Sequence, residues 1–245
     1  MRTHLAALVA ATALVAAPLV AVAGPASAAT CTAPEVLGTE VSPTNVIVGT
    51  SKVKSFDIYT DVAKNGCSLS SVKVTVRSPK NTAKNLTMQV VSVSDGVTTY
   101  AYTIELKASA LKNSEAGLWT ATSVTRWSGG AITSKDAFRV VRAAKLTTNA
   151  KPEPVTAGHR LVVTGKLTRA NWETRKYAGY TKRKVQLEFR PTGGTYGLVS
   201  TVTSHGKGAV QKTVTADVDG CYRFVFTGSS TTRKVTSKAD CVDVR

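Results

Sequence analysis

The sequence predicts an all-β protein made of two tandem β-sandwiches, and three observations support that fold class. Valine and threonine are abundant relative to the residues that favour long helices, and β-branched residues favour strands. Apolar and polar residues alternate with a period of two in many short segments, as on strands with one buried face. The third observation is a pattern that occurs twice, roughly one hundred residues apart, which indicates two similar units.

Residues 1–28 are predicted to be a secretory signal peptide. Arg2 precedes an apolar run from Leu5 to Ala23, and Ala26-Ser27-Ala28 is the small-x-small pattern that signal peptidase cleaves. We therefore expect cleavage after Ala28 and a secreted, extracellular protein. No second apolar stretch of ~20 residues follows, so we expect no membrane span.

The exported part contains four cysteines, and an even number outside the cytoplasm indicates disulfides. Three pairings are possible. Chain locality favours Cys31 with Cys67 and Cys221 with Cys241, because each pair then lies within one unit. We expect no metal and no cofactor, since no Cys-x-x-Cys unit and no calcium-binding loop is present.

The repeated pattern defines two predicted domains. Pro43 stands six residues before Gly49 in the first unit, and Pro152 stands six residues before Gly158 in the second. An apolar segment follows each glycine. The predicted domain ranges are 29–142 and 143–245, each about the size of one sandwich.

Strand positions follow from the alternation of apolar and polar residues. In the first unit the alternating segments include Val72–Arg77 and Tyr100–Leu106, and in the second they include Lys184–Arg190 and Cys221–Phe226. About seven such strands per unit, with a turn every ~10 residues, describe a β-sandwich.

A turn pattern makes the sandwich type more specific. An acidic residue, a glycine and an aromatic residue recur in Glu115–Trp119 and in Asp219–Tyr222. In immunoglobulin-type sandwiches this turn precedes the strand with the corner aromatic residue, so Trp119 and Tyr222 are the candidates. Ala121 stands where an antibody-type domain has its second core cysteine, so the likeness is to the immunoglobulin fold and not to antibody domains.

The chain resembles secreted two-domain proteins of actinobacteria that have immunoglobulin-like repeats and are mostly uncharacterised. The resembling stretches are Leu146–Val155, Thr164–Leu167, Asn171-Trp172, Tyr177–Tyr180 and Asp240–Val244. The resemblance covers nearly the whole mature chain. It implies the fold and secretion, and it implies no catalytic residue.

A catalytic constellation is not evident in the sequence, so we expect a protein that is not an enzyme. His159 and His205 each lie at a predicted turn beside glycine, without a partner nucleophile in a recognisable motif. The stretch from Ser204 to Gly208 resembles part of the signature of L,D-transpeptidases. Lys207 occupies the place of the nucleophilic cysteine and cannot form the acyl-thioester, so we interpret the stretch as a hairpin loop.

Charge is strongly positive and unevenly distributed. The formal net charge is +17. Residues 29–142 contain 13 basic and 8 acidic residues, whereas residues 143–245 contain 18 basic and 7 acidic ones. The candidate polyanion-binding residues in the second unit are Arg169, Arg175, Lys176, Lys182, Arg183, Lys184, Arg190 and Arg223, with Trp172, Tyr177 and Tyr180 as a candidate aromatic platform. Lys184, Arg190 and Arg223 are the strongest candidates because their phase on the predicted strands points them outward.

These observations favour a nonenzymatic binding or adhesion module. Basic residues at this density attract polyanions by counterion release, and aromatic residues among them can stack on sugars or bases. The expected partner is an anionic cell-wall polymer or another extracellular polyanion, bound by a monomer that is loosely associated with the wall. The alternatives are a protein-interaction or protease-inhibitor module that uses its loops, a small-ligand carrier, and a basic surface that serves solubility alone.

Overall fold

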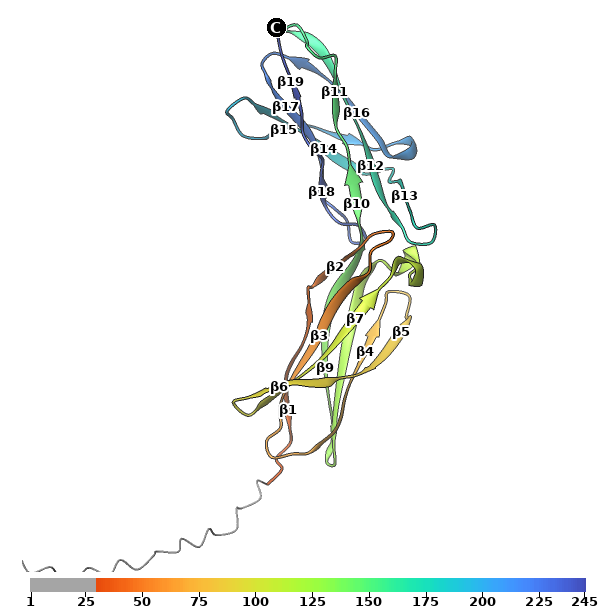
Figure 1. Ribbon diagram of the computed structural model, residues 1–245, viewed down its shortest axis with the longest axis vertical. Helices are drawn as coiled ribbons and strands as arrows, with labels where there is room; N and C mark the ends of the chain where they lie inside the picture. Colours follow the sequence, from red (N-terminus) through yellow and green to blue (C-terminus); the bar gives the residue numbers. More distant parts are fainter. Residues whose placement is uncertain (1–29) are drawn as a thin grey trace, which may run out of the picture.

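The computed structural model describes residues 30–245, so the predicted signal peptide lies outside the described residues. The described chain is all-β, as predicted, and its only helices are the three-residue 3-10 turns η1 (Ala108–Ala110), η2 (Asn113–Glu115) and η3 (Gly206–Gly208). Two β-sandwiches are stacked end to end (Figure 1). We call β1 to β9 the N-terminal sandwich and β10 to β19 the C-terminal sandwich.

The N-terminal sandwich has the strand order of an immunoglobulin domain. Its four-stranded sheet has the order β1 (Glu35–Ser42), β3 (Lys54–Ala63), β7 (Val97–Leu106) and β6 (Gln89–Ser94). Its five-stranded sheet has the order β2 (Asn45–Val48), β9 (Gly130–Arg142), β8 (Gly117–Trp127), β4 (Leu69–Arg77) and β5 (Ala83–Thr87). The pairing of β2 with β9 is parallel, and the other pairings are antiparallel. These two sheets correspond to the two layers of the immunoglobulin fold.

The C-terminal sandwich also consists of two sheets, but several of its edge strands are short and interrupted. One sheet is centred on β12 (His159–Asn171), which pairs with β10 (Ala144–Leu146), β11 (Asn149–Lys151), β13 (Lys176–Gly179) and β16 (Ala209–Ala216). The other has the order β15 (Gly197–Thr203), β14 (Lys184–Pro191) and β17 (Gly220–Phe226), with β18 (Val235–Thr236) and β19 (Asp240–Val242) both on the free side of β17. The neighbouring positions of β14 and β17 place their outward side chains on one surface.

The predicted corner aromatic residues lie near the start of the equivalent strands β8 and β17. The indole nitrogen of Trp119 donates a hydrogen bond to the Glu115 carbonyl oxygen at 2.7 Å, which ties the turn to the start of β8. Tyr222 is buried and packs against Phe189, with ring centroids 4.6 Å apart. The apolar phase of both strands thus faces the interior, as the alternation predicted.

Both predicted disulfides are present. Cys31 is bonded to Cys67, and Cys221 is bonded to Cys241. Cys221 and Cys241 are directly opposite each other on β17 and β19, out of phase with the inward Tyr222. The second bridge therefore joins two neighbouring strands on the outer side of their sheet.

The two sandwiches meet through a tryptophan. Trp172 directly follows β12 of the C-terminal sandwich, yet it is 1 % exposed and packs in the core of the N-terminal sandwich. Its indole nitrogen donates to the Val48 carbonyl oxygen at 3.2 Å, and its backbone N–H donates to Asn113 Oδ1 at 3.0 Å. This insertion makes a side chain from the C-terminal sandwich part of the N-terminal core.

A buried arginine, Arg142, also links the two sandwiches through hydrogen bonds of its side chain and its backbone. Arg142, the last residue of β9, is 6 % exposed, and its Nε donates to the Ala170 carbonyl. Its backbone N–H donates to Thr231, and its carbonyl accepts from the Arg233 N–H. Burial, and next the charge of Arg169, lower the pKa of Arg142 to about 10. Strand β9 therefore continues across the junction as main-chain pairing with the loop after β17.

Candidate binding surface

The predicted basic residues are divided among three places on the C-terminal sandwich. Arg175 and Lys176 lie at the turn between β12 and β13, on the side that faces the N-terminal sandwich, where Thr50 and Lys107 line the same hollow. A second group surrounds Tyr180, and a third lies on β14 and β17. Six of the eight predicted side chains are exposed, namely Arg175, Lys176, Lys182, Arg183, Lys184 and Arg190.

The second group is built around the ring of Tyr180. The guanidinium carbons of Arg169 and Arg183 lie 3.9 and 4.6 Å from the ring centroid, within the range of cation–π attraction. Arg169 also donates to Thr232 Oγ1 at 3.3 Å, and the Tyr180 hydroxyl lies 3.3 Å from Ser229 Oγ. Tyr180 thus holds two arginines and the loop after β17 in fixed positions.

This environment lowers the pKa of Tyr180 below its ordinary value. Burial acts to raise the pKa, but hydrogen bonds with Ser229 and Thr232 and the positive charges of Arg169 and Arg183 together outweigh it. The phenol of Tyr180 is therefore easier to deprotonate than a free tyrosine.

The predicted aromatic platform is not formed, because two of its three rings are buried. Trp172 is 1 % exposed in the junction and Tyr180 is 4 % exposed. Tyr177 is half-buried against the N-terminal core, with the Lys145 ammonium 4.1 Å from its ring centroid. These rings therefore pack in and against the two cores and do not form an exposed platform.

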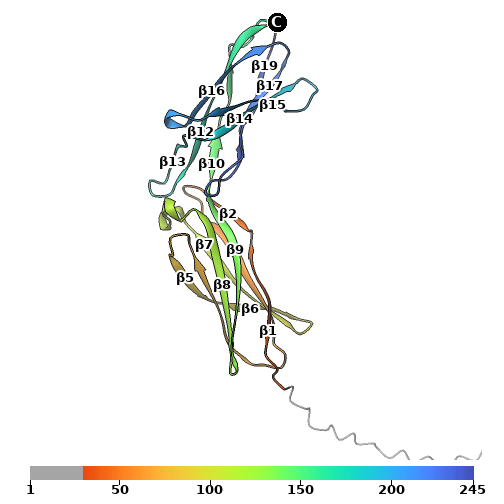
Figure 2. The same cartoon turned by 180° about the vertical axis from the view of Figure 1, so that it is seen from behind.

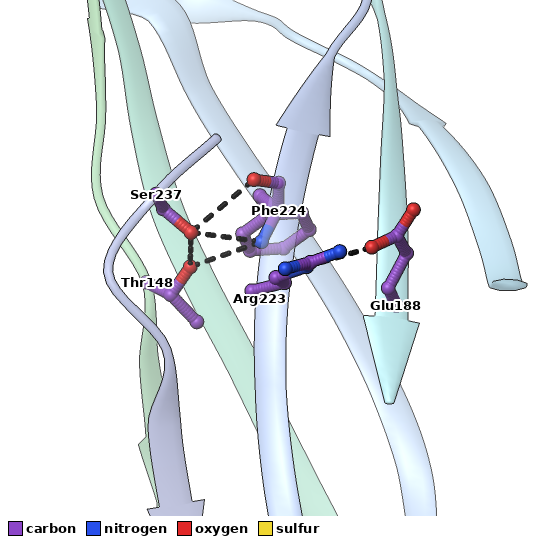
Figure 3. Close-up of polar contacts among 5 residues, drawn as sticks. All are labelled: Thr148, Glu188, Arg223, Phe224 and Ser237. Carbon is purple, nitrogen blue, oxygen red and sulfur yellow. Dashed lines mark hydrogen bonds and ion pairs between the residues drawn. The ribbon is translucent and has the colours of Figure 1, made fainter. Parts of the chain in front are cut away.

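The third group lies on neighbouring strands, as the outward phase predicted. Arg223 on β17 forms an ion pair with Glu188 on β14, with 2.7 Å between Nε and Oε2 (Figure 3). The Tyr196 ring lies 3.6 Å from the Arg223 guanidinium and 5.0 Å from that of Arg190. Arg223 is therefore partly neutralised, whereas Arg190 is exposed and has no ion pair among the described residues.

A pair of hydroxyl groups supports β17 from the side opposite Glu188. The hydroxyls of Thr148 and Ser237 lie 2.5 Å apart, and the Phe224 N–H points at both of them (Figure 3). Ser237 is buried, and its backbone N–H donates to the Phe224 carbonyl oxygen. These bonds satisfy the backbone of β17 where its pairing passes from β18 to β19, and they keep Arg223 on a rigid strand.

Sequence reasoning missed a basic groove at the junction. A hollow of about 390 Å³ is lined by Arg139 of β9, by Ile47 of β2 and by the loop after β17, including Arg233 and Lys234. None of its lining residues is acidic. The residues come from segments far apart in the sequence, and no local pattern connects Arg139 with Arg233.

The serine and the two histidines that were weighed as catalytic candidates do not form a catalytic arrangement with one another. Ser204 is buried, donates to the Tyr180 carbonyl oxygen at 2.7 Å and accepts from the Arg183 N–H. His205 and His159 are exposed at turns. Within residues 30–245 no group of three or more His, Cys, Asp or Glu side chains is arranged to hold a metal ion. The same part of the chain contains no helix long and apolar enough to cross a membrane.

No family model and no curated protein matches the chain. Among solved structures, the chain is similar to latent PorU from Porphyromonas gingivalis (16 % identity, TM-score 0.30), and it covers 20 % of that protein with 87 % of its own residues. The titin I-band fragment I67–I69 has 11 % identity and a TM-score of 0.35, with 86 % of this chain and 65 % of the fragment covered. The D0–D1 fragment of intimin has 14 % identity and a TM-score of 0.29, with 85 % and 98 % covered. The fold assignment rests on the strand order above and not on these distant likenesses.

Proposed function

We propose that the protein is a nonenzymatic extracellular binding module that associates with an anionic polymer of the cell envelope through its basic C-terminal sandwich. In this proposal the chain is secreted by cleavage after Ala28. The observation that supports it is the set of six exposed basic residues described above, none of which forms an ion pair among the described residues.

Exposed basic groups without partners favour a polyanion for a physical reason. Each lysine or arginine that meets an anionic group releases a condensed counterion, so affinity depends steeply on salt concentration. Arg183 and Arg190 are held by contacts with Tyr180 and Tyr196, which limits the side-chain entropy that binding costs. The arrangement therefore supports electrostatic adhesion with some geometric preference.

Cosedimentation with isolated Gram-positive cell walls tests this function. Walls with their anionic polymers should retain the protein at low salt, and walls stripped of those polymers should not. The variant with Lys182, Arg183 and Lys184 changed to Ser should be retained less and with a flatter salt dependence. A control with Lys151, Lys166 and Lys212 changed to Ser removes the same charge from the opposite sheet and should behave as the wild type.

Each alternative has its own outcome in this experiment. Retention that is insensitive to salt would favour a protein partner recognised through the loops, since an interface with a desolvated core does not depend on counterion release. Retention on neither kind of wall would leave the charge as a determinant of solubility and overturn the proposal.

A further inference from the structure

The outer face of the five-stranded sheet in the N-terminal sandwich is basic and free of carboxylates. Trp119 and Phe138 are buried and face the interior of the sandwich. Side chains alternate along a strand, so the residues between such buried positions on β4, β5, β8 and β9 face outward. The outward basic residues, which we call the basic ladder, are Arg126, Lys73, Lys135, Arg77 and Arg139. All five are exposed, and no aspartate or glutamate occupies an outward position of this sheet.

The strand register places the ladder residues at regular intervals. From the free end of the sandwich to the junction, the rows across the sheet are Ser71-Arg126-Ala131, Thr87-Lys73-Val124-Thr133, Asn85-Thr75-Thr122-Lys135, Ala83-Arg77-Thr120-Ala137 and Leu118-Arg139-Asn45. Each of these five consecutive rows contains one basic residue. Neighbouring rows are two residues apart along a strand, which is about 7 Å.

The opposite sheet of the same sandwich has the opposite charge. Its outward positions contain Glu35, Glu40, Asp57, Asp61 and Glu105, and they contain no lysine or arginine. The N-terminal sandwich has only a modest net charge, but the outward basic and acidic residues of its sheets are separated onto its two opposite faces. An anion meets an attractive field on the five-stranded face and a repulsive one on the other.

The ladder leads to the junction groove. Strands β8 and β9 lie along the length of the N-terminal sandwich, and β9 ends at the junction with the C-terminal one (Figure 2). At the last row, Arg139 donates to the Ser230 carbonyl oxygen at 3.4 Å and lines the groove together with Arg233 and Lys234. A linear ligand on the ladder thus passes from one sandwich to the other without meeting a carboxylate.

The chemistry of the face favours phosphate groups without bases. Beside the basic side chains, these rows contain five threonines, whose hydroxyls can donate hydrogen bonds to phosphate oxygens, and they contain no aromatic residue on which a base could stack. None of the five basic residues forms an ion pair among the described residues. We propose that the basic ladder and the junction groove bind a linear phosphodiester or phosphoanhydride chain that has no bases, laid along β8 and β9.

The basic ladder is a second binding surface, in addition to the basic surface of the C-terminal sandwich. This inference rests on the proposed function, because both require a polyanionic ligand. The test measures the affinity of residues 30–245 for inorganic polyphosphate across a salt series. The ladder variant changes Lys73, Arg77, Arg126 and Lys135 to Gln and leaves Arg139 at the junction intact. We expect its affinity to fall at least about tenfold, with the slope of log Kobs against log salt reduced by about 3, because four phosphate contacts are lost.

A charge-matched control changes Lys151, Arg160, Lys166 and Lys212 to Gln on the C-terminal sandwich, and we expect it to bind as the wild type. All eight substituted side chains are exposed, so we expect both variants to fold, and a thermal unfolding transition like that of the wild type checks this. Equal affinity of the ladder variant and the wild type, or an equal loss in the control, would overturn the inference. If the variant with Lys182, Arg183 and Lys184 changed to Ser loses polyphosphate and the ladder variant does not, the proposed function stands and this inference fails.

Two further probes test the chemistry of the ligand. Single-stranded poly(dT) should bind no more tightly than polyphosphate, and polyglutamate should bind more weakly. Tighter binding of poly(dT) would show that bases are recognised and contradict a ligand without them. Ladder-dependent binding of polyglutamate at the affinity of polyphosphate would contradict a preference for phosphate.

Discussion

Trp172 shows how one side chain determines the relation between the two sandwiches. The residue follows a strand of one sandwich and fills a place in the core of the other, with its indole N–H bonded to Val48. Local alternation predicts whether a side chain faces in or out of its own sheet, and it cannot reveal that the interior belongs to the neighbouring sandwich. For that reason a junction residue was assigned to an exposed aromatic platform.

Replacing Trp172 by Ala should destabilise the molecule strongly. Truncation of a buried tryptophan costs about 3–5 kcal/mol, since apolar contacts are lost and a cavity remains. Denaturant unfolding followed by circular dichroism measures this cost. A Trp172→Phe control keeps most of the apolar contact and should lose less. A cost of under 1 kcal/mol for Trp172→Ala would contradict the view that this ring is an integral part of the N-terminal core.

Tyr180 supplies a prediction about pH. Its pKa in the folded protein lies below the ordinary value of 10.0, so deprotonation is easier in the folded than in the unfolded state. This group therefore contributes stability that is fully present above about pH 10 and is lost as the pH falls through the folded pKa. An absorbance titration of phenolate should show a transition below pH 10 that is absent in Tyr180→Phe. Changing Arg169 to Gln should move that transition to higher pH, and an unchanged midpoint would contradict the role of the arginine.

At the scale of elements, the second disulfide joins β19 to β17, the strand that contains Arg223 of the third group of basic residues. Replacing Cys221 and Cys241 by Ala opens a loop of 20 residues and should lower the free energy of unfolding by about 3 kcal/mol in the chain-entropy model. Urea unfolding of the double variant, compared with the oxidised wild type, measures the loss. No change in the unfolding midpoint would show that β17 and β19 are held by their pairing alone.

Strand β6 is an edge strand with little protection. Val90, Val91 and Val93 are 54 %, 57 % and 69 % exposed, and the strand has no charged residue. Uncovered, uncharged edges pair readily with other strands, and an added lysine prevents this. Changing Val91 and Val93 to Lys should therefore slow aggregation, as measured by light scattering at elevated temperature. Val53→Lys, at an exposed valine outside any strand, is the control and should have little effect.

The elements themselves were largely predictable. Alternating segments such as Val72–Arg77 and Tyr100–Leu106 lie within β4 and β7, because period-two burial is a local property of the chain. The register was not predictable, because it pairs residues far apart in sequence. The basic ladder depends on that register, since Lys73 and Lys135 share a face only when β4, β8 and β9 lie side by side.

At the scale of the whole molecule, charge and shape act together. The sequence correctly indicated a basic protein and located an excess of charge in its second half. The structure adds that the first half is polarised, with its basic face leading to a junction groove lined by Arg139, Arg233 and Lys234. Two sandwiches joined end to end thus present an extended surface that suits a linear ligand better than a compact one.

The salt dependence of polyanion binding by residues 30–245 tests the central claim most directly. Isothermal titration with polyphosphate at several salt concentrations gives the slope of log Kobs against log salt. We predict a negative slope of about 3 or steeper, because several exposed basic residues engage phosphate groups and release counterions. A slope near zero, or no binding at low salt, would contradict the claim that the basic surface of this protein recognises a polyanion.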